Sequence, residues 1–187
     1  MADRRAEIVE AALALIREAG LASFTQPRVA ARLGLRQSHL TYYFPTRDDL
    51  FTAVAREAVR QRLAALEPLR DAAAADKVAV LAGVLVAPEQ TRVLLALTQS
   101  ADHDAAVAAC MVELGAGIAP LAASLLAAFG AEPTPTALDA VQAASTGLAV
   151  LALAQGGEAF RPRAQAVLTA LLTGLAAHPS PARGTAP

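Results

Sequence analysis

Apolar residues recur at helical spacing from the start of the chain. The first stripe places six side chains three or four residues apart, with Arg and Glu between them: Ile8, Ala11, Ala12, Leu15, Ile16 and Ala19. This spacing predicts an amphipathic helix that buries one face. Gly20 follows the last apolar position and predicts the end of that helix.

Two short helical segments follow and meet at Gly34. Thr25 is a suitable N-cap for the first segment. In the second, over residues 36–44, Leu40 and Phe44 lie one helical turn apart and are expected to point inward. Two short helices joined by a tight turn, with a longer helix on each side, predict a helix-turn-helix, whose second helix enters the major groove of DNA.

A long helix is predicted next. Thr46 and Asp49 have nearly the spacing of a capping box at its start. We expect it to extend over residues 48–69 and to connect two domains. The predicted domains are a helix-turn-helix DNA-binding domain over 1–47 and a helical domain over 48–187.

Helical patterns continue through the rest of the chain. Pro120 interrupts an apolar stretch over 104–129, and its ring predicts a kink or a division of that helix. Residues 178–187 are expected to fray. The predicted fold class is all-α: a three-helix, helix-turn-helix domain followed by a helical bundle, with about nine helices in total.

Composition supports this fold class. Aromatic residues are only 4% of the 187 residues and Ala is abundant, which favours closely packed helices over sheets. The single cysteine, Cys110, rules out a disulfide within one chain and a Cys-rich zinc site. We therefore predict no metal and no cofactor. The start of the chain leads into no apolar run, so we expect no secretory signal and a cytoplasmic location.

One uncharged stretch, Leu114–Ala131, is long enough to raise the question of a membrane span. Glycines and Pro120 interrupt it, and much of the remainder is Ala. We predict a buried helix at this position and no membrane partner.

Charge is distributed unevenly along the chain. Residues 1–62 carry ten Arg and seven acidic residues, whereas residues 63–187 carry six basic and ten acidic residues. A polyanionic partner is therefore expected to bind the first third of the chain. The excess is small and gives only weak support for nucleic-acid binding.

The N-terminal pattern strongly resembles the DNA-binding region of the TetR family of bacterial transcriptional regulators. The resemblance covers about residues 4–54 and rests on these positions in one register: Ile8, Ala11, Ala12, Leu15, Ile16 and Gly20, then Thr25, Val29, Ala30, Leu33, Gly34 and Leu35, then Leu40 and Tyr43–Leu50. Two positions depart from the family. Arg36 stands where the family usually has a capping Ser, and Thr41 stands where it usually has Tyr.

Candidate DNA-binding residues follow from the helix-turn-helix and from this resemblance. Gln37 and His39, at the start of the recognition helix, are candidates for contacts with base edges. Arg47 occupies a position at which the family has a phosphate-binding Lys. The full predicted set is Thr25, Gln26, Arg28, Arg36, Gln37, Ser38, His39, Thr41, Tyr42, Tyr43 and Arg47. Because Tyr42 and Tyr43 are adjacent on a helix, at least one of them is expected to be exposed.

The last two predicted helices, over 136–155 and 162–177, have too little polar surface to be solvated on a normal face. A second subunit is the expected cover, and the resemblance implies the same, because TetR-like regulators dimerise through their last two long helices. The alternative is that both helices are covered within the core of a monomer. The predicted interface comprises Ala140, Ala144, Gly147, Leu151, Leu168, Leu171, Leu172 and Leu175.

The resemblance also implies a pocket for a small-molecule effector, so that the domain over 48–187 is predicted to bind a ligand as well as to dimerise. Isolated polar or soft residues of the C-terminal body are its candidate lining: Gln99, His103, Met111, Glu113 and Gln142. With few aromatic rings in this region, a small neutral or acyl ligand is expected rather than a planar cation.

No pattern of catalytic residues emerges. Asp102, His103 and Asp104 are adjacent and point in different directions on a helix, so they form no ligand set by themselves. No nucleophile-elbow or phosphate-binding glycine motif occurs. We predict a protein that is not an enzyme.

Two functions therefore remain open. The first is a homodimeric, ligand-responsive regulator, a repressor that binds a palindromic operator and is released by its effector. The alternative is an all-helical interaction or ligand-carrier protein in which the N-terminal triplet of helices is purely structural.

Overall fold

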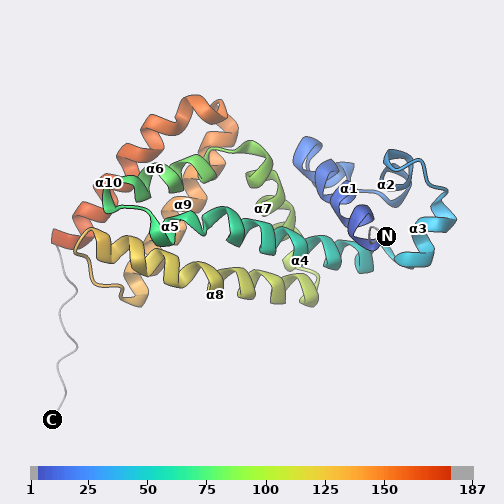
Figure 1. Cartoon of the computed structure of the whole chain (residues 1–187), viewed down its shortest axis with the longest axis horizontal. Coiled ribbons are helices and arrows are strands. Elements are labelled where there is room, and N and C mark those ends of the chain that lie inside the picture. Colours follow the sequence, from blue (N-terminus) through green and yellow to red (C-terminus); the bar gives the residue numbers. More distant parts are fainter. Residues whose placement is uncertain (1–3, 178–187) are drawn as a thin grey trace, which may run out of the picture. The chain divides into compact units, whose positions relative to one another are not determined.

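The computed structural model describes residues 4–177 and shows an all-helical chain (Figure 1). This confirms the predicted fold class. The described part contains ten α-helices, two short 3-10 helices and no β-strand. The α-helices are α1 (Arg4–Ala19), α2 (Gln26–Arg32), α3 (Gln37–Tyr43), α4 (Arg47–Leu66), α5 (Pro68–Asp71), α6 (Ala74–Leu85), α7 (Pro88–Ala101), α8 (Ala105–Ala128), α9 (Pro135–Gln155) and α10 (Arg161–Ala177). The 3-10 helices are Leu21–Ser23 and Gly157–Phe160.

The helices form two compact units, each with its own core. The first unit comprises α1 to α4 up to Ala65, α7, and α8 up to Ala116. The second comprises α5, α6, the part of α8 from Gly117, α9 and α10. The predicted domain boundary at residues 47 and 48 is a division by function, and it stays a prediction. The predicted frayed tail, 178–187, lies outside the described residues.

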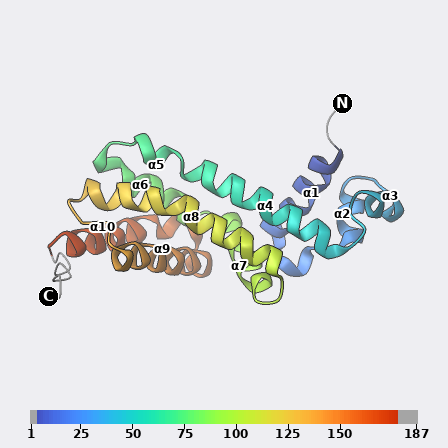
Figure 2. The same cartoon turned by 90° about the horizontal axis from the view of Figure 1, so that it is seen from below.

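Helices α1, α2 and α3 pack together in the first unit (Figure 2). The three phenylalanines Phe24, Phe44 and Phe51 are each at most 2% exposed. The Phe24 and Phe51 rings meet edge to face, with centroids 5.1 Å apart. These rings fill the centre of a small helical module.

Gly34 makes the turn between α2 and α3. Its φ of +65° is a left-handed conformation that favours glycine. The amides of Gly34 and Leu35 donate to the carbonyls of Ala31 and Ala30 at 3.1 and 2.9 Å. This is the hydrogen-bond pattern of a Schellman motif, which ends α2 and starts the chain toward α3.

The predicted capping box at the start of α4 is present. The Asp49 amide donates to Thr46 Oγ1 at 3.0 Å, and the Thr46 amide donates to Asp49 Oδ2 at 3.1 Å. The predicted end of the helix at residue 69 is wrong, because α4 ends at Leu66 and a separate helix begins at Pro68. Proline has no amide hydrogen to continue the ladder, and its ring clashes with the preceding turn.

Helix α8 continues through Pro120, so of the two predicted effects the division is wrong, and the kink stays a prediction. Proline leaves one carbonyl of the preceding turn without its helical donor, and the remaining hydrogen bonds keep the helix intact. Among the described residues, α8 and α9 are long and apolar enough to cross a membrane by length and composition. In this fold, each contributes buried residues to a shared core, including Leu125 on α8 and Ala152 on α9.

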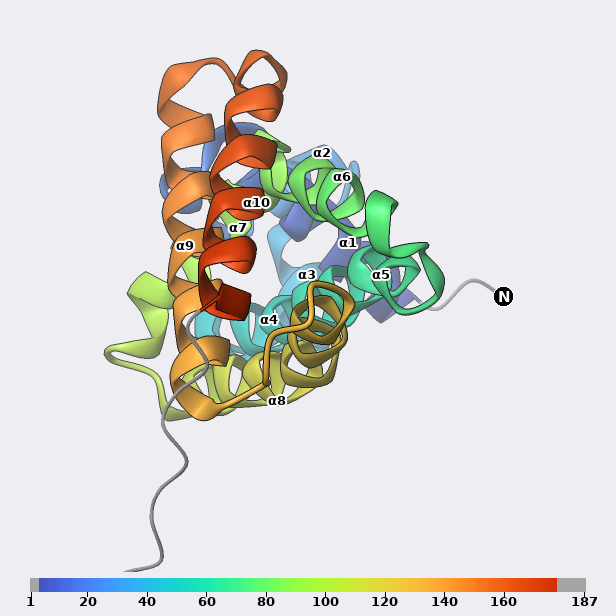
Figure 3. The same cartoon turned by 90° about the vertical axis from the view of Figure 1, so that its left-hand side faces the viewer.

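Helices α9 and α10 lie side by side and antiparallel in the second unit (Figure 3). Leu168 and Leu172 on α10 are completely buried in the core of this unit. Their predicted placement in a dimer interface is therefore wrong, since a side chain enclosed by its own subunit cannot touch a partner. The apolar stripe of α10 serves the core of the subunit itself.

The other predicted interface residues lie nearer the surface. Gly147 and Leu151 on α9 are exposed, and Leu151 is 42% exposed. Half-buried positions make up the rest of the predicted set: Ala140, Ala144, Leu171 and Leu175. These six positions remain available to a partner subunit.

Candidate nucleic-acid interface

Helix α3 exposes its polar side and buries little. Within the helix, Leu40 is the one buried side chain, and Phe44 at the C-cap is also buried. Because these two anchors point into the module, the opposite side of the helix faces outward. The exposed residues on this stretch are Arg36, Gln37, Ser38, His39 and Tyr42.

The exposed residues border a hollow of about 350 Å³ on the surface of the first unit. Arg36, Ser38, His39 and Tyr42 line it. The Tyr42 residue is 78% exposed, and its ring meets that of Tyr43 edge to face at 5.1 Å. The hollow thus combines a guanidinium, an imidazole and a phenol, all of which can donate hydrogen bonds to phosphate or to base edges.

Thr25 and Arg28 lie at the start of α2 and are both exposed. The Thr25 hydroxyl accepts a hydrogen bond from the Arg28 amide at 3.4 Å, so Thr25 caps α2 as predicted. A hydroxyl that accepts this bond still has a hydrogen to donate to a phosphate oxygen. On α3, the half-buried Thr41 hydroxyl donates to the Ser38 carbonyl at 3.1 Å.

Three of the predicted DNA-binding residues are also held by protein contacts. Gln26 is half-buried, and its Nε2 donates to the Phe44 carbonyl at 3.1 Å. The Tyr43 carbonyl accepts a hydrogen bond from Arg5 at 2.8 Å. The Arg47 guanidinium lies 5.1 Å from the centroid of the Phe24 ring, yet half of its side chain remains exposed.

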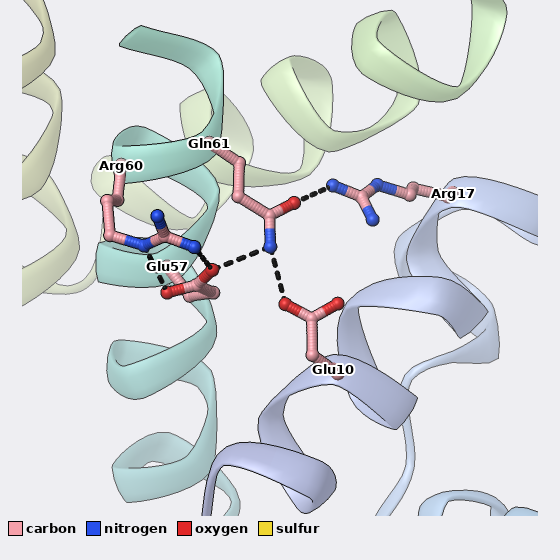
Figure 4. Close-up of polar contacts among 5 residues, drawn as sticks. All are labelled: Glu10, Arg17, Glu57, Arg60 and Gln61. Carbon is pink, nitrogen blue, oxygen red and sulfur yellow. Dashed lines mark hydrogen bonds and ion pairs between the residues drawn. The ribbon is translucent and has the colours of Figure 1, made fainter. Parts of the chain in front are cut away.

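A polar cluster that the sequence patterns did not predict joins α1 to α4 (Figure 4). At its centre, the Gln61 amide oxygen accepts a hydrogen bond from Arg17, and its nitrogen donates to Glu10 and Glu57. Arg60 pairs with Glu57, and its hydrogen bonds hold the pKa of the Glu57 carboxyl below its ordinary value. These residues are polar positions on two helices far apart in the sequence, and only the fold brings them together.

Helix α7 also holds α1. The Arg92 guanidinium donates to the Arg17 carbonyl at 2.8 Å, near the C-terminal end of α1. A cation at this end also complements the helix dipole. The module that carries α3 is thus fixed to α4 and α7 by polar contacts as well as by its apolar core.

The candidate effector residues are divided between the two units, and four of the five are exposed. Gln99, His103 and Glu113 are exposed on the first unit, and Gln142 is exposed on the second. Met111 is half-buried. The His103 imidazole lies 3.3 Å from Asp102, and both side chains are more than three-quarters exposed. Exposed side chains give no enclosure for a small molecule.

Among the residues that the structure describes, no group of three or more His, Cys, Asp or Glu side chains is placed to hold a metal ion. Cys110 is buried and unpaired by disulfide. Burial raises the pKa of its thiol, which opposes formation of a reactive thiolate.

Comparison with known proteins matches the same region. Residues 8–54 match the family described as bacterial regulatory proteins, tetR family. No curated protein gives a significant match to the chain.

Solved structures resemble the chain over most of its length. A transcriptional regulator from Rhodococcus sp. Rha1 has a TM-score of 0.79 at 19% identity, with 92% of this chain and 96% of that chain covered. A TetR-family member from Streptomyces coelicolor A3 has a TM-score of 0.68 at 27% identity, covering 90% and 98%. The multidrug binding protein EbrR, complexed with ethidium, has a TM-score of 0.66 at 28% identity, covering 91% and 98%.

Proposed function

We propose that this chain, whose residues 8–54 match the TetR family, is a repressor that binds a palindromic operator as a homodimer and leaves it when a small-molecule effector binds. The observation that carries the proposal is the exposed polar side of α3, whose side chains line a hollow on the surface. A recognition helix needs such a side, because its first residues must reach base edges in the major groove. DNA as the partner places the protein in the cytoplasm.

Hydrogen-bond donors and acceptors on this side of α3 decide which residues are suited to base edges and which to phosphates. Gln37 is exposed in the first turn of α3 and can pair with adenine through both atoms of its amide. His39, also exposed, can donate to guanine N7. Arg28, Arg36 and Arg47 are suited to phosphate oxygens, which set affinity and register without selecting sequence.

The surfaces of α9 and α10 support the dimer. On α9, Gly147 and Leu151 are exposed, and on α10, Val167 and Gly174 are exposed. Small and apolar residues on two adjacent helices allow a second pair of helices to approach closely. A two-fold dimer built this way also matches the symmetry of a palindromic site.

An effector acts on such a dimer by binding one conformation better than another. EbrR, a protein with a similar structure, was solved with ethidium and with proflavin. Linkage requires that operator DNA weaken effector binding by the same factor by which the effector weakens operator binding. Residues 70–187 contain two aromatic residues, Phe129 and Phe160, and Phe160 is buried. We therefore expect its effector to be a small neutral or acyl molecule.

A mobility-shift titration with DNA from the protein's own promoter region tests the proposal. We expect a discrete complex that survives competition by an excess of scrambled duplex, because specific sites bind roughly 10³-fold or more tighter than non-specific DNA. Equal affinity for both duplexes would overturn the proposal and favour a helical carrier with a purely structural N-terminal triplet.

A further inference from the structure

The recognition helix is too short to hold its own orientation. Helix α3 has seven residues, and an isolated helix of this length is unstable in water. Leu40 and Phe44 are its buried anchors, and both lie on one stripe. Two anchors on one stripe fix the depth of the helix but resist its rotation poorly, so further contacts must set the direction of the exposed residues.

Two side chains from other helices supply contacts at the C-terminal end of α3. Arg5 on α1 donates from Nη1 to the Tyr43 carbonyl at 2.8 Å, and its guanidinium lies 4.3 Å from the centroid of the Phe44 ring. Gln26 on α2 donates from Nε2 to the Phe44 carbonyl at 3.1 Å. Both carbonyls belong to the end of a helix, where no backbone donor is available within the helix.

We propose that Arg5 and Gln26 are positioning residues for DNA recognition, which hold the C-terminal carbonyls of α3 and thereby aim its N-terminal residues at base edges. This inference rests on the proposed function. It gives Gln26 a different role from the predicted direct contact with DNA, since the Gln26 amide is used inside the protein.

A small tilt of α3 about its C-terminal end displaces the residues at its N-terminal end. At 1.5 Å per residue, Gln37 lies about 9 Å along the axis from Tyr43, so a tilt of about 10° moves Gln37 by about 1.6 Å. Hydrogen bonds to base edges tolerate only a few tenths of an ångström. A loosened C-terminal end therefore costs sequence recognition, whereas long cationic side chains still reach phosphates.

The chain contains a matched control for the charge of Arg5. Arg4 is adjacent, equally cationic and exposed, and its described partner is Glu7 on the same helix. Arg4→Met and Arg5→Met remove the same charge from the same end of α1. Only Arg5→Met also removes the hydrogen bond to α3. Arg5→Lys keeps a cation that can donate to the Tyr43 carbonyl and lie over the Phe44 ring.

The test is a set of anisotropy titrations of the full chain and its variants on operator and scrambled duplexes. We expect Arg5→Met and Gln26→Met to lose roughly tenfold in operator affinity beyond the loss in Arg4→Met. On scrambled duplex, Arg5→Met and Arg4→Met should be equal, and Arg5→Lys should recover most of the operator affinity. Equal losses for Arg4→Met and Arg5→Met on the operator would overturn the proposal. A loss specific to Arg5→Met that is the same size on both duplexes would show a direct phosphate contact and would also overturn it.

Hydrogen exchange separates this proposal from the proposed function. Residues 37–44 should exchange faster in Arg5→Met than in Arg4→Met, while α1 and α4 keep their protection and so show that the variant is folded. Wild-type protein that binds both duplexes equally would defeat the proposed function, whatever the exchange result. Specific binding by the wild type, with unchanged exchange in Arg5→Met, would defeat the positioning role alone.

Discussion

Gln37 and Arg47 illustrate two ways in which one side chain can serve DNA binding. Gln37 is exposed on a short helix, and a planar amide there can distinguish one base from another. Arg47 carries a charge on an exposed side chain, and its guanidinium also lies 5.9 Å from the centroid of the Phe51 ring. The first residue can select sequence, whereas the second can only add attraction.

Substitution of each residue tests this difference. Gln37→Ala should cost about 1–3 kcal/mol on the operator and little on scrambled duplex, because only the operator offers the matching base. Arg47→Met keeps an apolar stem over the rings and removes the charge. It should weaken both duplexes similarly and reduce the salt slope by about one. Titrations at two salt concentrations measure both effects. An equal loss on the two duplexes for Gln37→Ala would show that another residue selects the base.

The burial of Cys110 predicts that its thiol reacts slowly in the folded protein. Its side chain is 3% exposed, and burial raises the pKa of the thiol. In native protein at pH 7.5, a water-soluble disulfide reagent should react with Cys110 at least about tenfold more slowly than in protein unfolded by guanidinium. Absorbance of the released thiol gives both rates. Similar rates would place Cys110 at the surface.

At the scale of elements, the sequence predicts the helices well, but it does not predict which neighbouring helices cover each side of a helix. The periodicity of α1 predicted Ile8 and Ile16 as buried, which is confirmed. It missed Leu13, which is also fully buried, and α1 packs against α7 as well as against α2. A helical pattern shows which side chains are apolar, but it does not show how many neighbours surround the helix.

The same difficulty applies at α10 and at Gln26. The stripe containing Leu168 and Leu172 was assigned to a partner subunit, whereas α6 and α9 pack against α10 within the chain. Gln26 is polar and lies at the start of α2, as a residue that contacts DNA would. Its hydrogen bond to the Phe44 carbonyl depends on the fold and could not be predicted from the sequence. Capping was predictable because a cap depends on residues a few positions apart, as with Thr46 and Asp49.

The pairing of α1 with α2 predicts a dependence of stability on pH. Arg32 donates two hydrogen bonds to the Glu18 carboxylate, at 2.8 and 2.5 Å, and these hold the pKa of Glu18 below its ordinary value of 4.5. A carboxyl whose pKa is lower in the folded state contributes stability above pH 4.5. That contribution is lost as the pH falls through the folded pKa.

We therefore expect wild-type protein to lose more stability than Glu18→Gln between pH 6 and pH 3. Urea unfolding followed by circular dichroism at each pH measures the difference. The pair is exposed on the surface, so the effect should be small. The same pH dependence in both proteins would show that the pair contributes nothing.

At the scale of the whole molecule, the proposed dimer would determine whether two recognition helices can act together. The exposed apolar residues Leu151 and Val167, at 42% and 41% exposure, belong to the two helices assigned to the interface. Leu151→Glu combined with Val167→Glu should give a folded monomer, because burial of these charges in an interface is costly. Val112→Glu is the control, since Val112 is 74% exposed and lies on α8. Light scattering should find a dimer for the wild type and the control. A monomeric wild type would contradict the dimer.

The central claim is that two copies of this chain recognise one palindromic operator. Sedimentation of the protein with a footprinted promoter duplex measures how many chains bind and how tightly. A second duplex that keeps only one half-site serves as the comparison. The two recognition helices of such a dimer span half-sites about 34–36 Å apart or multiples of that distance. We predict two chains on the palindrome and binding to the single half-site that is weaker by roughly 100-fold or more. One chain per palindrome, or equal affinity for the two duplexes, would contradict the account.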